Sequence, residues 1–318
     1  MPAHTAQMRG VFTIPVTPFD DHGDVDEASL RRCVQFCVDA GAHGVVAPVN
    51  ASEAPLLSEQ ERLRVASIVV EMVDHRVPVV IGVSAATTRL SQLFAQHARD
   101  IGADAVMAMP PYARKASSDE LLDYFRVVAK AAALPVFIQN YSAPIGTPMT
   151  AGVMARLIQD IDGVEYIKEE TLPAGHVMSE TFRLAGPRLK GIMGGMAGRF
   201  MLDEFARGAC GTMPACEVTD VHVAIWNALD SGDIARARTL HNRLIPLLNI
   251  EWMYGPAIYK EVLRRRGVID NAKLRGPGAV ELDTADHREL DAILADISQL
   301  FTAAPVVSGN GVAARGNV

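Results

Sequence analysis

One lysine, Lys168, stands where it could act as a nucleophile. It follows the short apolar stretch from Gly163 to Ile167, which has the length of a buried β-strand. A lysine that is withdrawn from water holds its proton less tightly, and the neutral amine can attack a ketone to form a Schiff base. The same position also suits an ordinary lysine at a strand end, so the segment alone leaves both interpretations open.

Other residues that could do chemistry give weaker signals. The nine histidines are scattered, without the spacing of two ligands on one helix face, so a metal-dependent mechanism is disfavoured. Cys33 and Cys37 lie one helical turn apart with no further ligands visible nearby, and we expect buried structural cysteines. The stretch from Gly191 to Gly198 lacks the lysine and the spacing of a phosphate loop, which favours a tight turn that lets the backbone approach a small ligand.

Two adjacent carboxylates, Glu169 and Glu170, follow the lysine. Neighbouring side chains on an extended segment point to opposite sides, so at most one of the two can face the same pocket as a ligand. We therefore expect a solvated or ion-paired role for both rather than an acid–base pair.

Eight short apolar segments must position these residues. They predict strands at 11–16, 44–49, 78–83, 105–109, 135–139, 164–168, 190–193 and 211–214. Amphipathic patterns between them predict helices, among them 27–40, 58–74, 88–101 and 118–132. Ser58 with Glu61 has the spacing of a capping box, and Ser118 with Leu121 fits it less well. Eight strands that alternate with helices indicate an α/β protein with a closed (β/α)8 TIM barrel, although an open doubly wound sheet shows the same alternation.

The strand pattern stops near residue 230. We therefore divide the chain into a barrel, residues 1–230, a helical region packed on it, residues 231–302, and a tail, residues 303–318. Three additional C-terminal helices are expected in the second part, at 233–250, 251–266 and 284–301. The tail is small, polar and glycine-bearing, and we expect it to be disordered.

The composition is that of a soluble globular protein, with 49% hydrophobic and 21% charged residues and a formal net charge of −7. The arginines form no basic stripe, so nucleic acid is not an expected partner. The longest apolar stretches are too short to span a membrane, and the N-terminal residues carry no apolar signal core. With four cysteines that fit reduced thiols, we expect a cytoplasmic location.

The carboxyl ends of the strands hold the active site in a parallel barrel. Lys168 is the amine among these ends, which otherwise carry hydroxyl and amide groups and no cluster of metal ligands. Besides the lysine, two tyrosines are candidate catalytic residues, Tyr112 and Tyr141. The predicted substrate-binding residues are Asn50, Ala51, Ser52, Gln139, Gly195 and Met213.

Four stretches of the chain are specific in combination. They are the opening 10–26 with Thr-Pro-Phe-Asp, the run 102–112 that ends in Pro-Pro-Tyr, the lysine motif 167–169, and the region 255–277. Together they resemble the Schiff-base lyases that include dihydrodipicolinate synthase and N-acetylneuraminate lyase. The resemblance implies an eight-stranded barrel with three extra helices, a lysine Schiff base with a small 2-keto acid, and no metal or other cofactor. It also implies a homo-oligomer, usually a tetramer built as a dimer of dimers.

Two departures from the family pattern bear on the reaction. Many members carry Gly-Thr-Thr-Gly-Glu after the second strand, whereas residues 49–53 here read Val-Asn-Ala-Ser-Glu, without the two threonine hydroxyls. Gln139 stands at the position of the family's proton-shuttling tyrosine, and no arginine follows it before Thr147. Dihydrodipicolinate synthase uses that arginine for its second, dicarboxylic substrate, so this activity is disfavoured.

One branch of the family looks more similar. The Asn-Ala-Ser-Glu loop, Gln139 and the Lys-Glu-Glu-Thr stretch at 168–171 resemble L-2-keto-3-deoxyarabonate dehydratase. This resemblance implies a lyase that dehydrates a 2-keto-3-deoxy sugar acid, because an iminium at C2 acidifies C3–H and the enamine expels the C4 hydroxyl. Retro-aldol cleavage uses the same imine, so a pyruvate-dependent aldolase is the alternative. A non-catalytic 2-keto-acid-binding protein is the second alternative.

The resemblance also implies roles for individual residues. Lys168 is the nucleophile, and residues 50–51 hold the substrate carboxylate largely through backbone groups. Gln139 and Tyr141 would orient substrate hydroxyls. Tyr112 is either an acid or an aromatic contact across a subunit boundary. An amide cannot be a general acid or base, so water, Tyr141 or Lys168 itself must move the proton.

Overall fold

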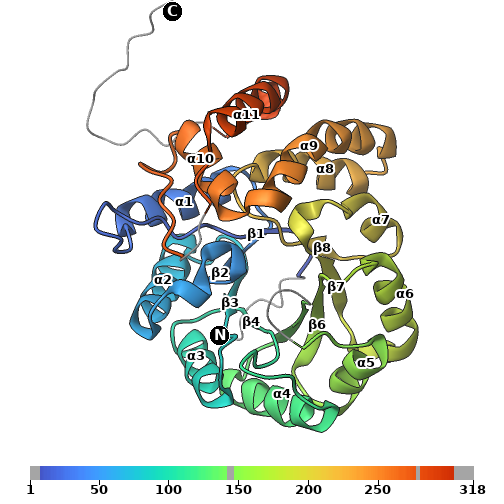
Figure 1. Ribbon diagram of the computed structural model, residues 1–318. Helices are drawn as coiled ribbons and strands as arrows, with labels where there is room; N and C mark the ends of the chain where they lie inside the picture. Colours follow the sequence, from blue (N-terminus) through green and yellow to red (C-terminus); the bar gives the residue numbers. More distant parts are fainter. Residues whose placement is uncertain (1–7, 142–146, 277–279, 304–318) are drawn as a thin grey trace, which may run out of the picture.

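Eight parallel strands close into a barrel, in which each strand pairs with its neighbours in the chain and β8 pairs with β1 (Figure 1). This computed structural model describes residues 8–141, 147–276 and 280–303. The strands are β1 Gly10–Thr13, β2 Gly44–Ala47, β3 Val79–Gly82, β4 Ala105–Ala108, β5 Val136–Asn140, β6 Val164–Glu169, β7 Gly191–Gly194 and β8 Gly211–Thr212. The predicted barrel is confirmed, and the open sheet is excluded.

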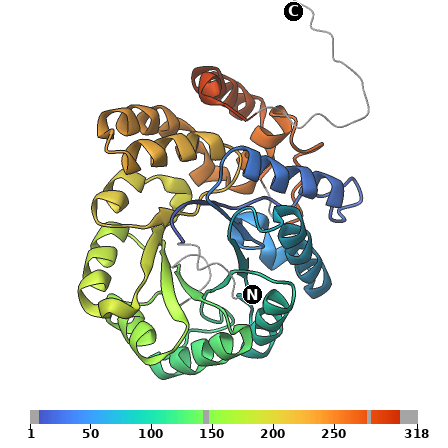
Figure 2. The same cartoon turned by 180° about the vertical axis from the view of Figure 1, so that it is seen from behind.

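Helices α1 to α8 cover the outside of the barrel, each after the strand of the same number (Figures 1 and 2). They are α1 Glu27–Asp39, α2 Glu59–Val73, α3 Thr88–Asp100, α4 Ser118–Ala132, α5 Ala151–Asp160, α6 Ala174–Ala185, α7 Met201–Ala206 and α8 Thr219–Asp230. Short 3₁₀ helices occur at η1 Asn50–Ser52, η2 Ala54–Leu56, η3 Gly186–Arg188, η4 Met196–Gly198 and η5 Ser298–Leu300.

Three further helices follow the barrel, as predicted: α9 Ile234–Tyr254, α10 Pro256–Arg265 and α11 Thr284–Ile297. Helix α9 packs against α8, and both α10 and α11 pack against α9. The division of the chain near residue 230 into two parts stays a prediction. The predicted disordered tail lies outside the described residues except for Ala303, whose N–H donates to Asp220.

The predicted break between the first two of these helices, after residue 250, is wrong. Helix α9 continues to Tyr254, and the chain turns at Gly255, which has a φ of 52°, before Pro256 begins α10. Glycine tolerates this left-handed backbone, and proline suits the first helical position because its missing N–H would have no partner there. Glu251 and Trp252 therefore belong to the last turn of α9.

The helix caps show the same kind of difference. Ser58 and Glu61 form the predicted capping box at the start of α2. At α4 the capping box is formed by Ser117 and Glu120, not by Ser118 and Leu121. Leucine cannot return a hydrogen bond to the cap backbone, whereas a glutamate three residues after the cap can.

Apolar side chains form three clusters. The barrel interior is filled by Met8, Phe12, Ile14, Val46, Val49, Val80, Ala105, Met107, Phe137, Tyr166, Met193 and Met213. A second cluster lies between the strands and the surrounding helices α1 to α6, and a third joins α8 to α11. The filled interior leaves room for a ligand only at an end of the barrel.

A buried ion pair joins the C-terminal helices to the loop after β2. The ammonium of Lys260, on α10, contacts the carboxylate of Glu53 and lies 4.2 Å from the centre of the Phe19 ring. Lys260 is fully buried and Glu53 is 5% exposed. Burial lowers the pKa of Lys260 although Glu53 opposes this effect. The pair holds Glu53, which has a φ of 55°, between η1 and η2.

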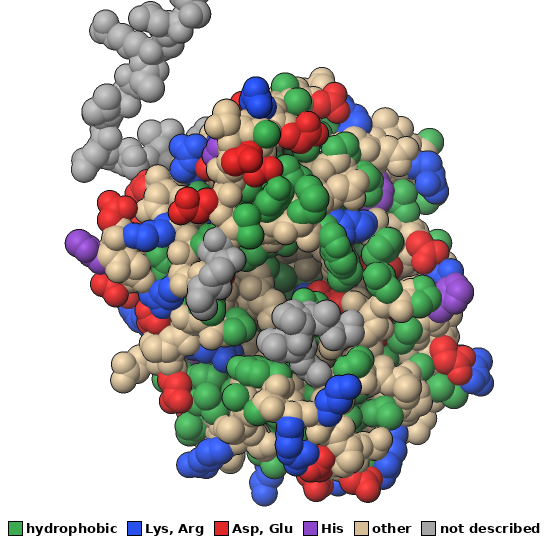
Figure 3. Space-filling view, in the orientation of Figure 1, with side chains coloured by type: hydrophobic (Ala, Val, Ile, Leu, Met, Phe, Trp, Pro, Cys, Tyr) green, Lys and Arg blue, Asp and Glu red, His purple; other side chains and the backbone are tan. Residues whose placement is uncertain are grey.

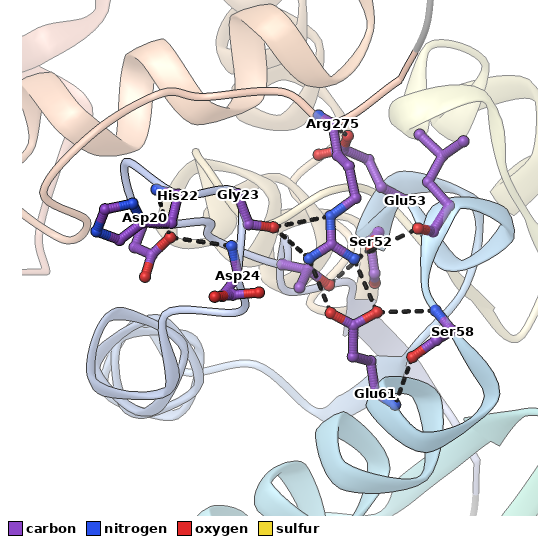
Figure 4. A network of polar contacts seen from close by, with 11 residues as sticks. Asp20, His22, Gly23, Asp24, Ser52, Glu53, Ser58, Glu61 and Arg275 are labelled. Carbon is purple, nitrogen blue, oxygen red and sulfur yellow. Dashed lines mark hydrogen bonds and ion pairs between the residues drawn. The ribbon is translucent and has the colours of Figure 1, made fainter.

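Arg275 adds a second connection to the same loop (Figure 4). Its guanidinium donates two hydrogen bonds of 2.8 Å to Glu61, and its backbone N–H donates to Glu53. The hydrogen bonds from Arg275 lower the pKa of Glu61 to about 2. The segment after α10 is thus tied to the N-terminus of α2 and to the loop that precedes it.

Among the residues that the structure describes, no helix combines the length and the apolar character that crossing a membrane requires.

We expect Lys260→Met to destabilise the protein by about 3–5 kcal/mol, because it leaves the buried Glu53 carboxylate without its partner. Urea unfolding would measure the change, with Lys130→Met on the exposed face of α4 as the control. The double variant Glu53→Gln/Lys260→Met should recover much of the loss, since no lone buried charge remains. A single variant as stable as the control would contradict this role.

Candidate active site

A cavity of about 820 Å³ lies over the carboxyl ends of the strands. The face seen in Figure 3 is hollowed near its centre, and apolar side chains lie along part of the rim. Seven of the predicted site residues line the cavity or contact Glu170, which lines it. Those that line it directly are Lys168, Tyr141, Asn50, Ala51 and Met213.

Lys168 forms an ion pair with Glu170 inside this cavity. The distance from Lys168 Nζ to Glu170 Oε1 is 3.1 Å, and the two side chains are 4% and 9% exposed. The lysine is the fifth residue of β6, and the carboxylate follows directly after that strand. A carboxylate at hydrogen-bond distance can accept the protons that the amine must lose when it attacks a carbonyl group.

Two neighbouring strands hold Glu170 in this position. Gln139 of β5 is paired in register with Lys168, and its amide donates a 2.6 Å hydrogen bond to Glu170 Oε2. Gly195, after β7, lies directly beneath the glutamate, and a Cβ atom there would come within 2.4 Å of Glu170 Cγ. The sequence predicted that Gln139 and Gly195 bind the substrate, whereas the structure places both against Glu170.

The expectation for the two adjacent glutamates holds only in part. Glu170 is ion-paired and faces the cavity, but neither glutamate is solvated, since Glu169 is 1% exposed. Glu169 accepts hydrogen bonds from Asn140 Nδ2 at 2.8 Å and from the Thr171 N–H at 2.7 Å. Burial raises the pKa of Glu169 despite these bonds. Glu170 is a site residue that the sequence alone did not select.

The loop after β2 contributes backbone to the cavity. Asn50 and Ala51 begin the one-turn helix η1, whose first N–H groups have no acceptor within the helix. Ser52 is buried, and its hydroxyl donates to the Pro15 carbonyl at 2.7 Å, while Thr17 donates to the Ser52 carbonyl. The structure thus uses the Ser52 side chain to fasten the loop to the end of β1, not to line the cavity.

The two predicted tyrosines lie in different places. Tyr141 is half-buried on the cavity, and burial, together with the nearby Glu170, raises the pKa of its phenol. Tyr112 does not line this cavity; with Arg62 and Ser84 it borders a smaller hollow, and Asn50 lines both. Its predicted roles as an acid or as a subunit contact stay predictions.

The C-terminal helices supply cavity residues that sequence reasoning missed. Trp252 and Glu251 come from the end of α9, Tyr259 comes from α10, and Arg199 follows η4. One signal was available, because Leu244, Leu247, Leu248 and Glu251 repeat at the spacing of a buried helix face. An acidic residue on such a face marks a buried polar site.

The cysteines differ from expectation in one respect. The sulfur atoms of Cys33, Cys37 and Cys216 all lie within 4.8 Å of one another, so a third potential metal ligand joins the predicted pair. Cys33 and Cys37 are buried, as predicted, and so is Cys216, whose Sγ lies 3.5 Å from Sγ of Cys33. This cluster belongs to the core around α1 and does not border the cavity.

The closed barrel, with a buried lysine and carboxylate at the mouth, has the architecture of the enzymes that bind carbonyl substrates through a lysine Schiff base. Residues 7–297 match the dihydrodipicolinate synthetase family, and the chain belongs to that family. Its members are class I Schiff-base lyases, so the chain is an enzyme of the lyase class.

Two curated relatives have different activities. The chain is 32% identical to the L-2-keto-3-deoxyarabonate dehydratase of Azospirillum brasilense over 293 residues, which cover 91% of this chain and 94% of the relative. It is 31% identical to a 4-hydroxy-tetrahydrodipicolinate synthase of Chelativorans sp. over 287 residues, which cover 90% and 97% of the two chains. The family is therefore shown, while the two names point to different reactions.

Solved structures agree on the fold. A putative dihydrodipicolinate synthetase from Pseudomonas aeruginosa superposes with a TM-score of 0.85 at 28% identity, over 91% of this chain and 99% of the other. Dihydrodipicolinate synthase from Rhodopseudomonas palustris gives a TM-score of 0.85, also at 28% identity, over 92% and 98%.

We expect Gly195→Ala to displace Glu170 from Lys168 and to slow covalent trapping of a 2-keto acid by borohydride about 100-fold, the loss typical of an ångström-scale misplacement. Mass spectrometry of the trapped enzyme would measure the rate. Gly152→Ala, where the added methyl group meets only Thr150 Oγ1 at 3.9 Å, is the matched control. Equal trapping rates in both variants would rule out this positioning role.

Behind the site, burial raises the pKa of Glu204 to about 8, and no donor among the described residues reaches its carboxyl oxygens. The folded protein therefore keeps a proton that the unfolded chain releases above pH 4.5, so stability falls as the pH rises from 4.5 to 8. This effect lowers the free energy of unfolding by about 3 kcal/mol at pH 7, and Glu204→Gln should restore that stability. Unfolding curves across this pH range should show the gain growing with pH, while the exposed Glu289→Gln shows none.

Proposed function

We propose that the protein is a lysine-dependent hydro-lyase that removes water from a small 2-keto-3-deoxy sugar acid. The observation that carries the proposal is the Lys168–Glu170 pair, in which a carboxylate lies 3.1 Å from the amine that would become the imine nitrogen. A base so close to that nitrogen is also close to C3, the carbon next to the imine carbon. The similarity to the Azospirillum brasilense dehydratase supports the same class of reaction.

Glu170 would act as the proton carrier in each step. It moves two protons in turn from the Lys168 ammonium to the C2 carbonyl oxygen, which leaves as water when the iminium forms. The carboxylate then removes a proton from C3 to give the enamine. The enamine expels the C4 hydroxyl, which takes that proton from Glu170 and leaves as a second water. Hydrolysis of the unsaturated imine restores the lysine and releases the product.

The iminium supplies the electron sink for this reaction. Its positive nitrogen takes up the electron pair that the C3–H bond releases, and it returns that pair when the C4–O bond breaks. The proposed scheme therefore uses the covalent imine through Lys168 and no metal or other cofactor. Its partner is a small-molecule 2-keto acid, and the expected homo-oligomer stays a prediction.

One neighbour favours loss of water over retro-aldol cleavage. Glu170 could serve as the base for either reaction, and the amide of Gln139 moves no proton. The raised pKa of Tyr141 keeps its phenol protonated. A neutral phenol at the cavity can therefore donate a hydrogen bond to the departing C4 hydroxyl.

The sequence argues against the synthase reaction named for other relatives. Residues 50–51 offer backbone N–H groups to the substrate carboxylate but replace the two family threonines with Asn and Ala. No arginine follows Gln139 before Thr147, so the group that holds a second, dicarboxylic substrate in the synthase is missing from that stretch.

Borohydride with pyruvate should add the mass of reduced pyruvate to the peptide that contains Lys168. Lys168→Ala should abolish the modification, and Lys190→Ala, at a largely exposed lysine, should leave it unchanged. An unmodified Lys168 at saturating pyruvate would refute the Schiff base and favour a non-catalytic binding protein.

Glu170→Gln should lower dehydration at least about 100-fold, since general acid–base catalysis contributes about 10²–10⁴. A panel of 2-keto-3-deoxy acids, scored for pyruvate release against formation of the dehydrated keto acid, would measure turnover. Dehydrated product supports the proposal. Release of pyruvate with an aldehyde would instead identify an aldolase on the same scaffold.

A further inference from the structure

One wall of the cavity carries polar groups that the proposed reaction does not use. Arg199, Glu251 and Tyr259 all line the cavity, from the segment after β7 and from helices α9 and α10. The charges that shift the pKa of Glu251 are those of Glu217 and Arg199. Lys168, by contrast, is paired with Glu170. The cavity thus holds a second polar centre, distinct from the reacting lysine.

Glu251 is buried without a hydrogen-bond donor. Its side chain is 2% exposed, and among the residues that the structure describes no N–H or hydroxyl group reaches either carboxyl oxygen. Its neighbour is the carboxyl group of Glu217, which is fully buried and equally without a donor. Two carboxyl groups form a hydrogen bond only when one of them keeps its proton.

The proton of this pair resides on Glu251. Burial, reinforced by the charge of Glu217, raises the pKa of Glu251 well above its ordinary value. Burial also raises the pKa of Glu217, to about 7, so the pair carries at most a single negative charge when Glu251 donates to Glu217. The second oxygen of Glu251 remains an acceptor on the cavity wall.

Arg199 places a donor on the same wall. Its guanidinium lies 4.8 Å from the centre of the Trp252 ring, and one of its Nη atoms donates to the Leu248 carbonyl. The Nε–H is buried and has no acceptor among the described residues. The positive charge of Arg199 offsets the negative charge that the Glu217–Glu251 pair carries.

Glu251 has carboxyl oxygens without a donor and Arg199 has an Nε–H without an acceptor among the described residues. A wall with both an acceptor and donors fits a hydroxyl group, which donates one hydrogen bond and accepts others. A carboxylate fits it poorly, because it only accepts and would face the Glu251 acceptor beside a buried negative charge. A cavity of about 820 Å³ also exceeds the needs of pyruvate, so a longer substrate can extend away from the lysine.

We infer that Arg199, Glu251 and Tyr259 bind the hydroxyl-bearing end of the substrate, remote from the imine, and select a monocarboxylic 2-keto-3-deoxy sugar acid over a dicarboxylic acid of equal length. This inference rests on the proposed function, because it takes Lys168 as the point of attachment. It makes Glu251 a specificity-determining residue.

The test measures the concentration of keto acid that gives half-maximal borohydride trapping at Lys168, with each adduct resolved by mass. Pyruvate, a monocarboxylic 2-keto-3-deoxy sugar acid and a dicarboxylic acid of the same carbon number are compared. This readout counts imine formation whichever bond breaks afterwards. The wild-type enzyme should bind the hydroxylated monocarboxylic acid at least about tenfold more tightly than the dicarboxylic acid.

Glu251→Met should raise the half-saturating concentration of the hydroxylated acid about tenfold or more and leave that of pyruvate unchanged, since pyruvate does not reach the wall. Glu251→Gln is the conservative variant. Its amide N–H can replace the shared proton toward Glu217, and its carbonyl oxygen preserves the acceptor, so binding should stay close to wild type.

Glu251→Met leaves Glu217 as a lone buried charge, so the double variant Glu217→Gln/Glu251→Met provides a folded comparison and should show the same selective loss. Equal shifts for all three acids, or unchanged binding in both methionine variants, would overturn the role of the wall. Absence of any adduct at Lys168 would overturn this inference together with the proposed function. Adducts that form at equal half-saturating concentrations of the hydroxylated and the dicarboxylic acid would overturn the role of the wall and leave the proposed function standing.

Discussion

The site depends on one constraint, which is that a lysine and a glutamate form an ion pair with little exposure to solvent. Lys168 and Glu170 are 4% and 9% exposed and 3.1 Å apart. A buried ion pair stabilises a protein only when further hydrogen bonds satisfy its remaining groups. Gln139 supplies such a bond from β5, and the absence of a side chain at Gly195 leaves the space that the carboxylate occupies. Three neighbouring strands thus share the task of placing one carboxylate beside one amine.

The C-terminal helices complete the cavity in two ways. They support the loop after β2 through the buried pair of Lys260 and Glu53 and through Arg275, so the backbone at residues 50–51 has a fixed position. They also bring Glu251 and Tyr259 to the cavity itself. A barrel without these helices would keep Lys168 but would lose this part of the cavity wall.

Much of the fold and part of the site could be predicted from the sequence. The alternation of apolar strands and amphipathic helices predicted the barrel, and the lysine motif predicted the nucleophile. Local errors arose where a stronger neighbouring signal was overlooked, as with Gly255 and Pro256 at the end of α9 or with Ser117 and Glu120 at α4. The structure also gives some predicted site residues other neighbours than a substrate, because Ser52 fastens the loop to β1 and Gln139 and Gly195 contact Glu170. Tyr112, a predicted catalytic residue, lies at a smaller hollow.

The sequence by itself determined the barrel, the three added helices and the lysine at a strand end, because hydrophobic periodicity and caps act between residues a few positions apart. Only the tertiary structure decided what surrounds the lysine. Cys33 meets Cys216 across 183 positions, and Glu217, just before α8, is a neighbour of Glu251 on α9, which packs against α8. Barrel closure brings such distant residues together, and their burial there sets which side chains keep their protons. The lysine is therefore a property of the sequence, whereas the acid–base environment that directs it is a property of the fold.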